Sequence, residues 1–349
     1  MKKKKSLLKL LVTAITAASL VTATSTGSFA AAAKTTTGTA LSDTPLYSFS
    51  VISDCHVNVN DGDRNVNFTN ALQCIKYKFG SDSCIVMNGD VVDDNSEYDT
   101  LGKLISSANS GKRLPYIYFN YGNHEFDDHP GDSPHVENYN QSLDTFIRET
   151  NRIQTNYLNH SDAVRDAGNS YDWKYVKGNL FFFLGTDKLA YDQQINCADL
   201  NRNYQLSHLF SKLNSTSGWK FVFCHQPPHG TVQGSDWTNC ICERSYNDPN
   251  GDYFENNIKQ YNKTIMFTSH THRDFNQYKN APDGSKDAFG GNNDDFYQLG
   301  GCSVFNTSSV KYCAQGLHVI VYSDHVHVDG VQYKSPTSVS FVSKRDVRN

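Results

Sequence analysis

The sequence predicts an α/β protein, a four-layer α-β-β-α sandwich in which two mixed β-sheets are flanked by helices. Two observations support this fold class. Early in the domain, short apolar runs alternate with stretches of helical periodicity, which is typical of parallel β-α-β units. Toward the C-terminus, short apolar runs follow one another across turns, which is typical of antiparallel hairpins.

In the first part of the domain, residues 46–53 alternate apolar and polar side chains and predict a strand. The apolar residues of 65–79 have helical spacing, and Gly80 ends this predicted helix. Residues 84–87 form a short apolar run with β-branched side chains, which predicts a buried strand. The other elements expected in this part are a helix over 98–107 and a strand over 115–120.

The later segments are richer in predicted strands. Strands are expected over residues 169–175, 180–185, 219–224, 264–268, 296–299, 317–322 and 326–333. Helices are expected over residues 200–213 and 253–261. Residues 281–295 are rich in Gly, Asn and Asp and predict a mobile loop.

Residues 1–33 have the features of a cleaved export signal. A lysine-rich start precedes an apolar run over residues 7–21, and the small residues around Ala30 suit a signal peptidase. The alternative is a membrane anchor, but threonine and serine interrupt the apolar run, which is short for a membrane span. We therefore expect a secreted protein, free of the membrane after cleavage. The expected linker is residues 34–45, and one catalytic domain is expected over residues 46–349.

The formal net charge of the chain is -4. Removal of residues 1–30, which contain five lysines and no acidic residue, changes this charge to -9. A protein with this charge is not attracted to nucleic acid by its overall electrostatic field. We therefore expect no nucleic-acid partner, and any phosphate group must be attracted locally, by metal ions.

The chain has nine cysteines, and because this number is odd, at least one thiol is free or paired between molecules. Cys84 and Cys224 lie within apolar runs and are expected in the core. Cys240 and Cys242 do not have the spacing of a zinc knuckle. A disulfide from this loop to a cysteine elsewhere in the chain is therefore favoured over a metal or redox pair.

Polar residues that can bind metal ions follow five of the predicted strands. Asp90, for example, comes just after the strand over 84–87, at the position where open α/β sheets place ligands. The complete set is Asp54 and His56, then Asp90, then Asn123 and His124, then His225, then His270 and His272. One such residue alone is usually explained by turn formation. Turn formation does not explain five such strand ends in one chain, and together they predict a metal centre.

These motifs are similar to those of the calcineurin-like metallophosphoesterase superfamily. The pattern of that family is Asp-x-His, Gly-Asp-x-x-Asp, Gly-Asn-His-Glu/Asp, a later His, and Gly-His-x-His. The corresponding residues here are Asp54-Cys55-His56, Gly89-Asp90-Val91-Val92-Asp93, Gly122-Asn123-His124-Glu125, His225 and His270-Thr271-His272. The resemblance extends over about residues 46–333, with Ser269 in a position where the family usually has glycine.

The resemblance implies a role for each residue. One ion would be bound by Asp54, His56 and His272, and a second by Asn123, His225 and His270, with Asp90 bridging the two. Nitrogen and oxygen ligands without a thiolate suit Mn, Fe, Zn or Co, and do not choose among them. His124 would contact the phosphoryl oxygen or protonate the leaving group, and the carboxylate of Asp93 would orient its imidazole. Asp93 also stands where purple acid phosphatases have a tyrosine ligand, so we expect no iron-tyrosinate centre.

Together these features predict a phosphoric ester hydrolase that acts on small-molecule phosphate mono- or diesters through a hydroxide activated by two metal ions. One alternative is a 5'-nucleotidase-like phosphatase, because residues 122–127 are similar to the motif of those proteins. They usually have a further C-terminal domain, for which this sequence is too short. A different class is a secreted binding module with structural metals, but such sites are normally closed by protein ligands and do not need His124 and Asp93. We expect loops 235–252 and 281–295 to determine the substrate preference.

Overall fold

The computed structural model describes residues 41–126, 139–161, 165, 168–189, 197–200, 202–235, 239–241, 253–277 and 294–348. The predicted signal peptide and most of the predicted linker lie outside these residues, as do most of the two loops expected to determine the substrate preference. Within the described part of the chain, no helix is both long enough and apolar enough to cross a membrane.

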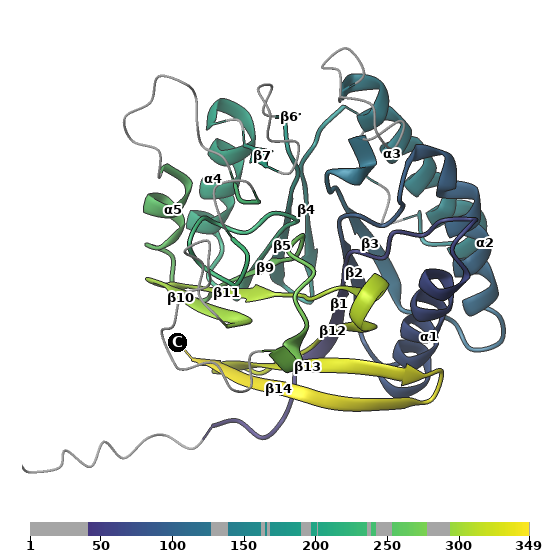
Figure 1. Ribbon diagram of the computed structural model, residues 1–349. Helices are drawn as coiled ribbons and strands as arrows, with labels where there is room; N and C mark the ends of the chain where they lie inside the picture. The colour runs from purple at the N-terminus through teal and green to yellow at the C-terminus, as the bar shows by residue number, and fades with distance from the viewer. Residues whose placement is uncertain are drawn as a thin grey trace, which may run out of the picture. The chain divides into compact units, whose positions relative to one another are not determined.

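Two six-stranded sheets form the centre of the domain (Figure 1). The first has the order β14-β13-β12-β1-β2-β3 and consists of β1 (Tyr47–Ile52), β2 (Cys84–Asn88), β3 (Tyr116–Asn120), β12 (Gln315–Val321), β13 (His325–Ser335) and β14 (Ser338–Arg348). The second has the order β10-β11-β9-β8-β5-β4 and consists of β4 (Asp172–Val176), β5 (Asn179–Leu184), β8 (Lys220–Cys224), β9 (Thr264–Thr268), β10 (Phe296–Leu299) and β11 (Cys302–Asn306). A separate two-stranded ribbon pairs β6 (Lys188–Leu189) with β7 (Ala198–Asp199).

Both sheets are mixed. In the first, β1, β2 and β3 are parallel, whereas β12, β13 and β14 continue the sheet in antiparallel fashion. In the second, β5, β8, β9 and β11 are parallel, and β4 and β10 are antiparallel strands at the edges. Antiparallel hairpins therefore complete two sheets whose central strands are parallel, as the sequence predicts.

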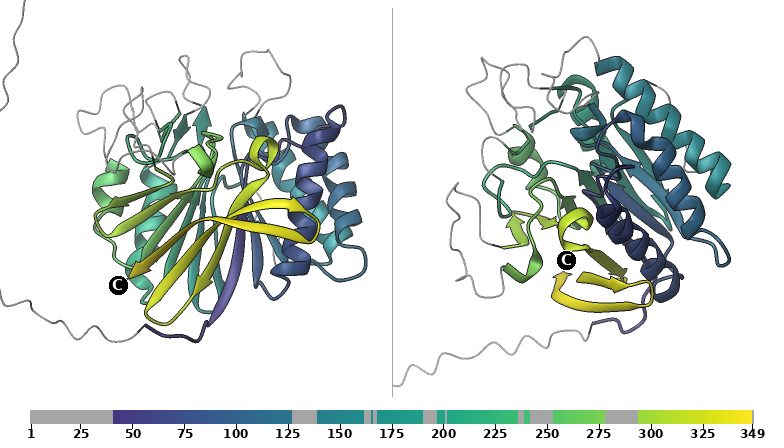
Figure 2. Two further views of the ribbon diagram at one scale, coloured as in Figure 1. Left: turned by 60° about the horizontal axis from the view of Figure 1, so that its bottom comes forward. Right: turned by 45° about the vertical axis from the view of Figure 1, so that its right-hand side comes forward.

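Helices cover the outer face of each sheet (Figure 2). The first sheet is covered by α1 (Gly62–Lys78), α2 (Tyr98–Ala108) and α3 (Tyr139–Ile153), and the second by α4 (Ser207–Ser215) and α5 (Tyr253–Ile258). The remaining helical segments are α6 (Val310–Cys313) and the short turns η1 (Asn95–Glu97), η2 (His124–Phe126), η4 (Gln154–Leu158), η6 (Arg202–Leu206) and η7 (Phe275–Gln277). Two mixed sheets between two groups of helices confirm the predicted fold class.

The core between the two sheets is largely aromatic. The ring centroid of Phe49, on β1, lies 4.9 Å from that of Phe181 and 5.0 Å from that of Phe221, both on the second sheet. All three side chains are fully buried. Burial of one phenylalanine side chain contributes about 1.5–3 kcal/mol, so these contacts fix the position of one sheet on the other. This packing also fixes the positions of the loops at the ends of the two sheets relative to each other.

The longest strands and α-helices that were not predicted are α3, β11 and β14; the short β6, β7 and α6 were not predicted either. In α3, Leu143, Phe146 and Ile147 are buried on one face, at the spacing of an amphipathic helix. Strand β14 is mostly exposed at the edge of the first sheet and carries charged side chains, so its sequence lacks the alternation of a half-buried strand. The helix expected over 200–213 is also different, because residues Arg202–Leu206 are π-helical and only Ser207–Ser215 form an α-helix.

Cys84 and Cys224 are buried free thiols, which confirms their expected place in the core. Cys197 is disulfide-bonded, and Cys240 is buried beside it. Cys242 lies outside the described residues. The disulfide expected for the Cys240 and Cys242 loop therefore stays a prediction.

Candidate metal centre

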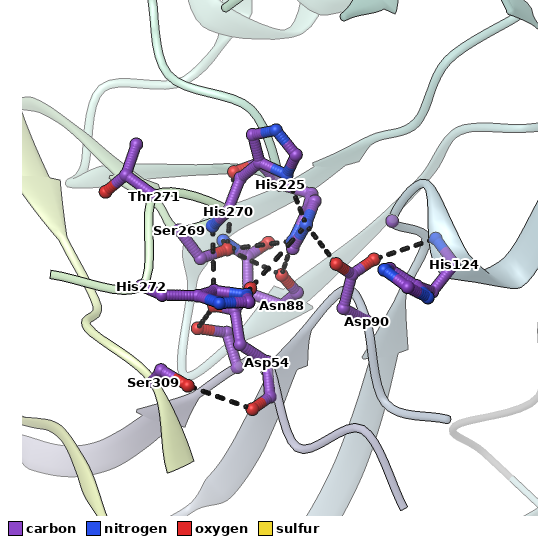
Figure 3. A network of polar contacts seen from close by, with 12 residues as sticks. Asp54, Asn88, Asp90, His124, His225, Ser269, His270, Thr271, His272 and Ser309 are labelled. Atoms are coloured by element: carbon purple, nitrogen blue, oxygen red, sulfur yellow. Dashed lines mark hydrogen bonds and ion pairs between the residues drawn. The ribbon is translucent and has the colours of Figure 1, made fainter. Parts of the chain in front are cut away.

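The candidate metal centre lies where parallel strands of both sheets end. Strands β1, β2 and β3 of the first sheet lead into Asp54 and His56, Asp90, and Asn123 and His124. Strands β8 and β9 of the second sheet lead into His225, His270 and His272. The structure thus brings the predicted residues of both sheets to one place (Figure 3).

Five of these residues have a left-handed backbone conformation, although none is a glycine. They are Asp54 (φ 48°), His56 (φ 44°), Asp90 (φ 49°), His270 (φ 69°) and His272 (φ 53°). This conformation costs roughly 1–2 kcal/mol for a residue with a Cβ atom. Strain of this kind is concentrated at functional sites, where the surrounding structure maintains it.

One group of four side chains has potential ligand atoms within 4.8 Å of one another: Asp54, His56, Asp90 and His272. Nε2 of His272 lies 2.8 Å from Oδ1 of Asp54 and 3.2 Å from Nε2 of His56. Nε2 of His56 lies 3.7 Å from Oδ2 of Asp90. The first three residues are buried, and the side chain of His272 is 25% exposed, so the group opens to solvent on the His272 side.

A second group contains Asp90, His225 and His270. Nε2 of His225 lies 3.0 Å from Oδ2 of Asp90 and 3.3 Å from Nδ1 of His270. Nε2 of His270 is buried without a hydrogen-bond partner among the described residues. The same holds for Oδ1 of Asn123, in the loop after β3. Asp90 belongs to both groups, and Figure 3 shows it beside His225 and His124.

The donor atoms of both groups fit metal ions. In each group two imidazole nitrogens face each other, His56 with His272 and His225 with His270, beside a buried carboxylate. Buried polar atoms without partners cost free energy, and cations between them would satisfy these atoms. Imidazole, carboxylate and amide donors suit first-row transition metals.

Outer contacts fix the imidazole of His225. Its Nδ1 lies 2.9 Å from the backbone oxygen of Asn88 and 3.0 Å from Oγ of Ser269, and this hydroxyl also donates to Asn88 O at 2.9 Å. Because a carbonyl oxygen only accepts, Nδ1 carries a proton, and Nε2 is the ring atom that faces Asp90. Ser269, which replaces the usual glycine of the motif, therefore contributes a side-chain contact to a candidate ligand.

His56 is oriented in the same way by Asp93. Nδ1 of His56 donates to Oδ1 of Asp93 at 3.0 Å. The other carboxylate oxygen of Asp93 accepts from Asn58 at 3.0 Å and from Arg64 at 2.9 Å. A carboxylate behind a histidine ligand fixes its tautomer and raises its basicity. Burial raises the pKa of Asp93, but the hydrogen bond and charge of His56, the hydrogen bond of Asn58 and the charge of Arg64 outweigh it and hold this pKa below its ordinary value.

The expected contact between the carboxylate of Asp93 and the imidazole of His124 is wrong. Nδ1 of His124 instead donates to the backbone carbonyl of Asp93 at 3.0 Å. The carboxylate is held by His56 and Arg64, although one of its oxygens still lies within 4.8 Å of a ring nitrogen of His124. The ring centroid of His124 lies 4.4 Å from that of His56, so His124 stands beside the first group.

Burial and neighbouring charges shift the pKa values of the side chains in the centre. Burial raises the pKa of Asp90, but the neighbouring His225 and His124 outweigh it and hold the pKa well below its usual range. Burial lowers the pKa of His225, whereas Asp90 and Asp54 together raise it to about 9. Burial, and then the charge of His225, lowers the pKa of His270 to about 3. The buried carboxylate of Asp90 is thus ionised and attracts cations.

Burial also lowers the pKa of His124, but the charge of Asp90 and the hydrogen bond to the Asp93 carbonyl outweigh it, and the net shift is upward. The imidazole therefore holds its proton more strongly than an exposed histidine does.

Sequence analysis gave no separate role to Glu125. This carboxylate is fully buried and accepts from the backbone N–H groups of Val91 at 2.7 Å, Gly122 at 2.7 Å and Asp90 at 3.0 Å. Burial and then the charge of Asp90 raise the pKa of Glu125 to about 7. Glu125 joins the loops after β2 and β3. Its position directly after His124 in the motif was the only signal in the sequence.

Asn88 and Asn120, the last residues of β2 and β3, were also missed. Nδ2 of Asn88 donates to the backbone oxygens of Cys224 and Phe267, both at 3.1 Å, on the second sheet. Nδ2 of Asn120 donates to Oδ1 of Asn88 and to Leu184 O, both at 3.0 Å. These amides connect the two sheets directly beneath the candidate metal centre.

The fold and the site together define a class of hydrolase: an α/β sandwich with a centre suited to two ions at the carboxyl ends of its strands. The chain belongs to the calcineurin-like phosphoesterase family, whose model matches residues 47–274. It is therefore a metallophosphoesterase, a phosphoric ester hydrolase, in a family that typically binds two metal ions.

Solved structures share this fold. A dimetal phosphatase from Danio rerio has a TM-score of 0.53 and 12% sequence identity, and the match covers 86% of this chain and 99% of that protein. A purple acid phosphatase from yellow lupin (Lupinus luteus) seeds has a TM-score of 0.50 and 10% identity, with 86% of this chain and 53% of the lupin protein covered. At these identities the likeness shows the fold alone. None of the curated proteins matches the chain.

Proposed function

We propose that this protein is a secreted phosphoesterase that hydrolyses small-molecule phosphate mono- or diesters with two bound metal ions. The observation that supports this most directly is the position of Asp90. Its carboxylate is shared by two groups of donor atoms, with Nε2 of His225 3.0 Å from Oδ2 and Nε2 of His56 3.7 Å from the same oxygen. A carboxylate between two histidine-containing groups suits a bridging ligand.

Each group would hold one ion. The first would be bound by Asp54, His56 and His272, the second by Asn123, His225 and His270, and Asp90 would bridge both. The donors suit Mn, Fe, Zn or Co. When bound, such ions would supply a more acidic water molecule and stabilise charge on the phosphoryl oxygens.

His124 would supply the proton for the leaving group. Its Nδ1–H is engaged by the carbonyl of Asp93 at 3.0 Å, which leaves Nε2 as the ring atom for exchange with substrate. The His124 backbone N–H donates to Oδ1 of Asp90 at 3.0 Å, so the residue is fixed relative to the bridging carboxylate (Figure 3). Such an arrangement is suited to general acid catalysis on an alkoxide leaving group.

Export is proposed from the first 33 residues, with their lysine-rich start, apolar run and small residues. The substrate would then be a phosphoester outside the cell. No attraction of nucleic acid is expected, because the mature chain is acidic.

The test is turnover by the mature chain loaded in turn with Mn, Fe, Zn or Co. Aryl and alkyl phosphate mono- and diesters serve as substrates. We expect hydrolysis that is lost with a chelator and restored by metal. A folded protein that binds two ions per chain and hydrolyses none of these esters would overturn the proposal. That result would favour a secreted binding module with structural metals.

A further inference from the structure

Residues 307–315, after β11, hold an exposed tyrosine against the candidate metal centre. This segment contains α6 and lies outside the residues 47–274 that match the family model. The family model therefore assigns it no role.

Hydrogen bonds attach the segment to the loop of a candidate metal ligand. The backbone N–H of Val310 donates to Ser53 O at 3.1 Å, and that of Lys311 donates to Asp54 O at 2.9 Å. Oγ of Ser309 donates to the same backbone oxygen of Asp54 at 3.2 Å (Figure 3). The segment and Asp54 are thus held as one unit.

Strained residues lie on both sides of α6. Ser308 and Ala314 have φ values of 64° and 48°, in the left-handed region that residues with a Cβ atom rarely adopt. Sγ of Cys313 also lies 4.0 Å from the backbone oxygen of His272. The turn therefore has a fixed conformation, as is typical of strained segments at functional sites.

Within this turn, Tyr312 lies beside His272, a member of the first group of ligands. Its ring centroid lies 5.3 Å from that of His272, and Nζ of Lys311 lies 4.7 Å from the same tyrosine ring. The Lys311 side chain is itself only 8% exposed. Tyr312 nevertheless remains 64% exposed. Single exposed aromatic residues are common, but this ring is held in place by two neighbours, one of them a candidate metal ligand.

We propose that Tyr312 binds a planar aromatic group of the substrate, so that the preferred substrates are phosphoesters whose organic part contains an aromatic or heteroaromatic ring. This inference rests on the proposed function. Aromatic rings attract one another at centroid separations of about 4.5–7 Å. The contacts of Tyr312 with His272 and Lys311 restrict its ring before a substrate binds, which reduces the additional ordering that stacking requires.

The test compares two ligands that resist hydrolysis, phenylphosphonate and methylphosphonate, by calorimetry on the metal-loaded protein. The wild type should bind phenylphosphonate more tightly. In Tyr312→Ala the ratio of the two Kd values should move toward one by about two- to tenfold. Tyr312→Phe should keep the ratio, and Tyr312→Leu, which retains an apolar side chain without an aromatic face, should reduce it.

Tyr77→Ala is the matched control. Tyr77 resembles Tyr312 because it is 50% exposed and Nζ of Lys76 lies 4.9 Å from its ring centroid. Unlike Tyr312, Tyr77 lies near the C-terminal end of α1 and not on the segment after β11. An equal effect of Tyr77→Ala, no effect of Tyr312→Ala, or no preference of the wild type for the phenyl compound would overturn the inference. Absence of hydrolysis of any ester is a separate result, because it contradicts the proposed function while the ratio of Kd values still tests Tyr312.

Discussion

The backbone carbonyl of Asp93 accepts a 3.0 Å hydrogen bond from Nδ1 of His124. The carboxylate of the same residue accepts one of 3.0 Å from Nδ1 of His56. One residue thus orients two histidines through different atoms. A side-chain substitution removes only the second contact, so the two functions of Asp93 can be separated by experiment.

Asp93→Ala is expected to weaken metal binding. The substitution removes the acceptor behind His56 and also the partner of Arg64. Loss of such an outer contact typically lowers metal affinity about 10–100-fold. At saturating metal, the dependence of the rate on leaving group should resemble that of the wild type, because the carbonyl that holds His124 remains.

Competition with a chelator measures the affinity, and Asp63→Ala, which removes an exposed acid from the first turn of α1, is the control. Unchanged metal affinity together with a lost dependence on leaving group would mean that the side chain of Asp93 acts on His124 after all.

His124→Asn should leave the metal content near that of the wild type and reduce the rate by about 10²–10⁴-fold, as is typical for loss of a general acid. The decrease should be largest for alkyl esters, because a nitrophenolate leaves without a proton. Rates on a series of esters and elemental analysis of the same sample check this. Metal loss, or an unchanged rate on alkyl esters, contradicts the role proposed for His124.

Asp90→Asn should deplete both ions and abolish hydrolysis of all esters together, since both groups share this carboxylate. Metal should also stabilise the wild type, by about 2.7 kcal/mol at a free metal concentration 100 times the Kd. Thermal unfolding with and without metal measures this effect. The increase in Tm should disappear in Asp90→Asn, and an equal increase in this variant would place the stabilising ions elsewhere.

Gly122→Ala should displace Asp90 in the candidate metal centre by steric overlap. A Cβ atom at this position would overlap the backbone N and Oδ1 of Asp90. Overpacking of this kind typically costs about 1–3 kcal/mol. We expect a lower Tm and weaker metal binding. Gly62→Ala is the control, because a Cβ there has no atom within 4 Å. Equal behaviour of the two variants would show that the loop after β3 adapts.

Mass spectrometry of the exported protein should find a new N-terminus between residues 29 and 35. The apolar run over residues 7–21 and the small residues around Ala30 are the reason. Exported protein that retains residues 1–20 would contradict cleavage and favour the membrane anchor.

The alternation of elements and the ligand loops were predictable, because polar ligands directly follow apolar runs such as 84–87. Contacts that depend on how the two sheets pack could not be predicted from the sequence. The link from Asn88 to Cys224 exists only once two sheets face each other. The hydrogen bond from His124 to the carbonyl of Asp93 depends on the orientation of a peptide group, which cannot be read from the residue types in the motif. Tyr312 was missed because it follows the last motif by about 40 residues and carries no metal-ligand signature.

The candidate centre takes Asp54 and Asp90 from one sheet and His225 and His270 from the other. An ion coordinated by Asp90 and His225 would therefore act as a cross-link between the two halves of the sandwich, above the hydrogen bonds of Asn88. Buried aromatic and aliphatic side chains between the sheets, and a hydrogen bond from Nε1 of Trp219 to Tyr322 O at 3.2 Å, also hold the halves together. The ion would add a clamp at the end where its ligands lie, so the unfolding rate of the molecule would depend on the metal supply of its surroundings.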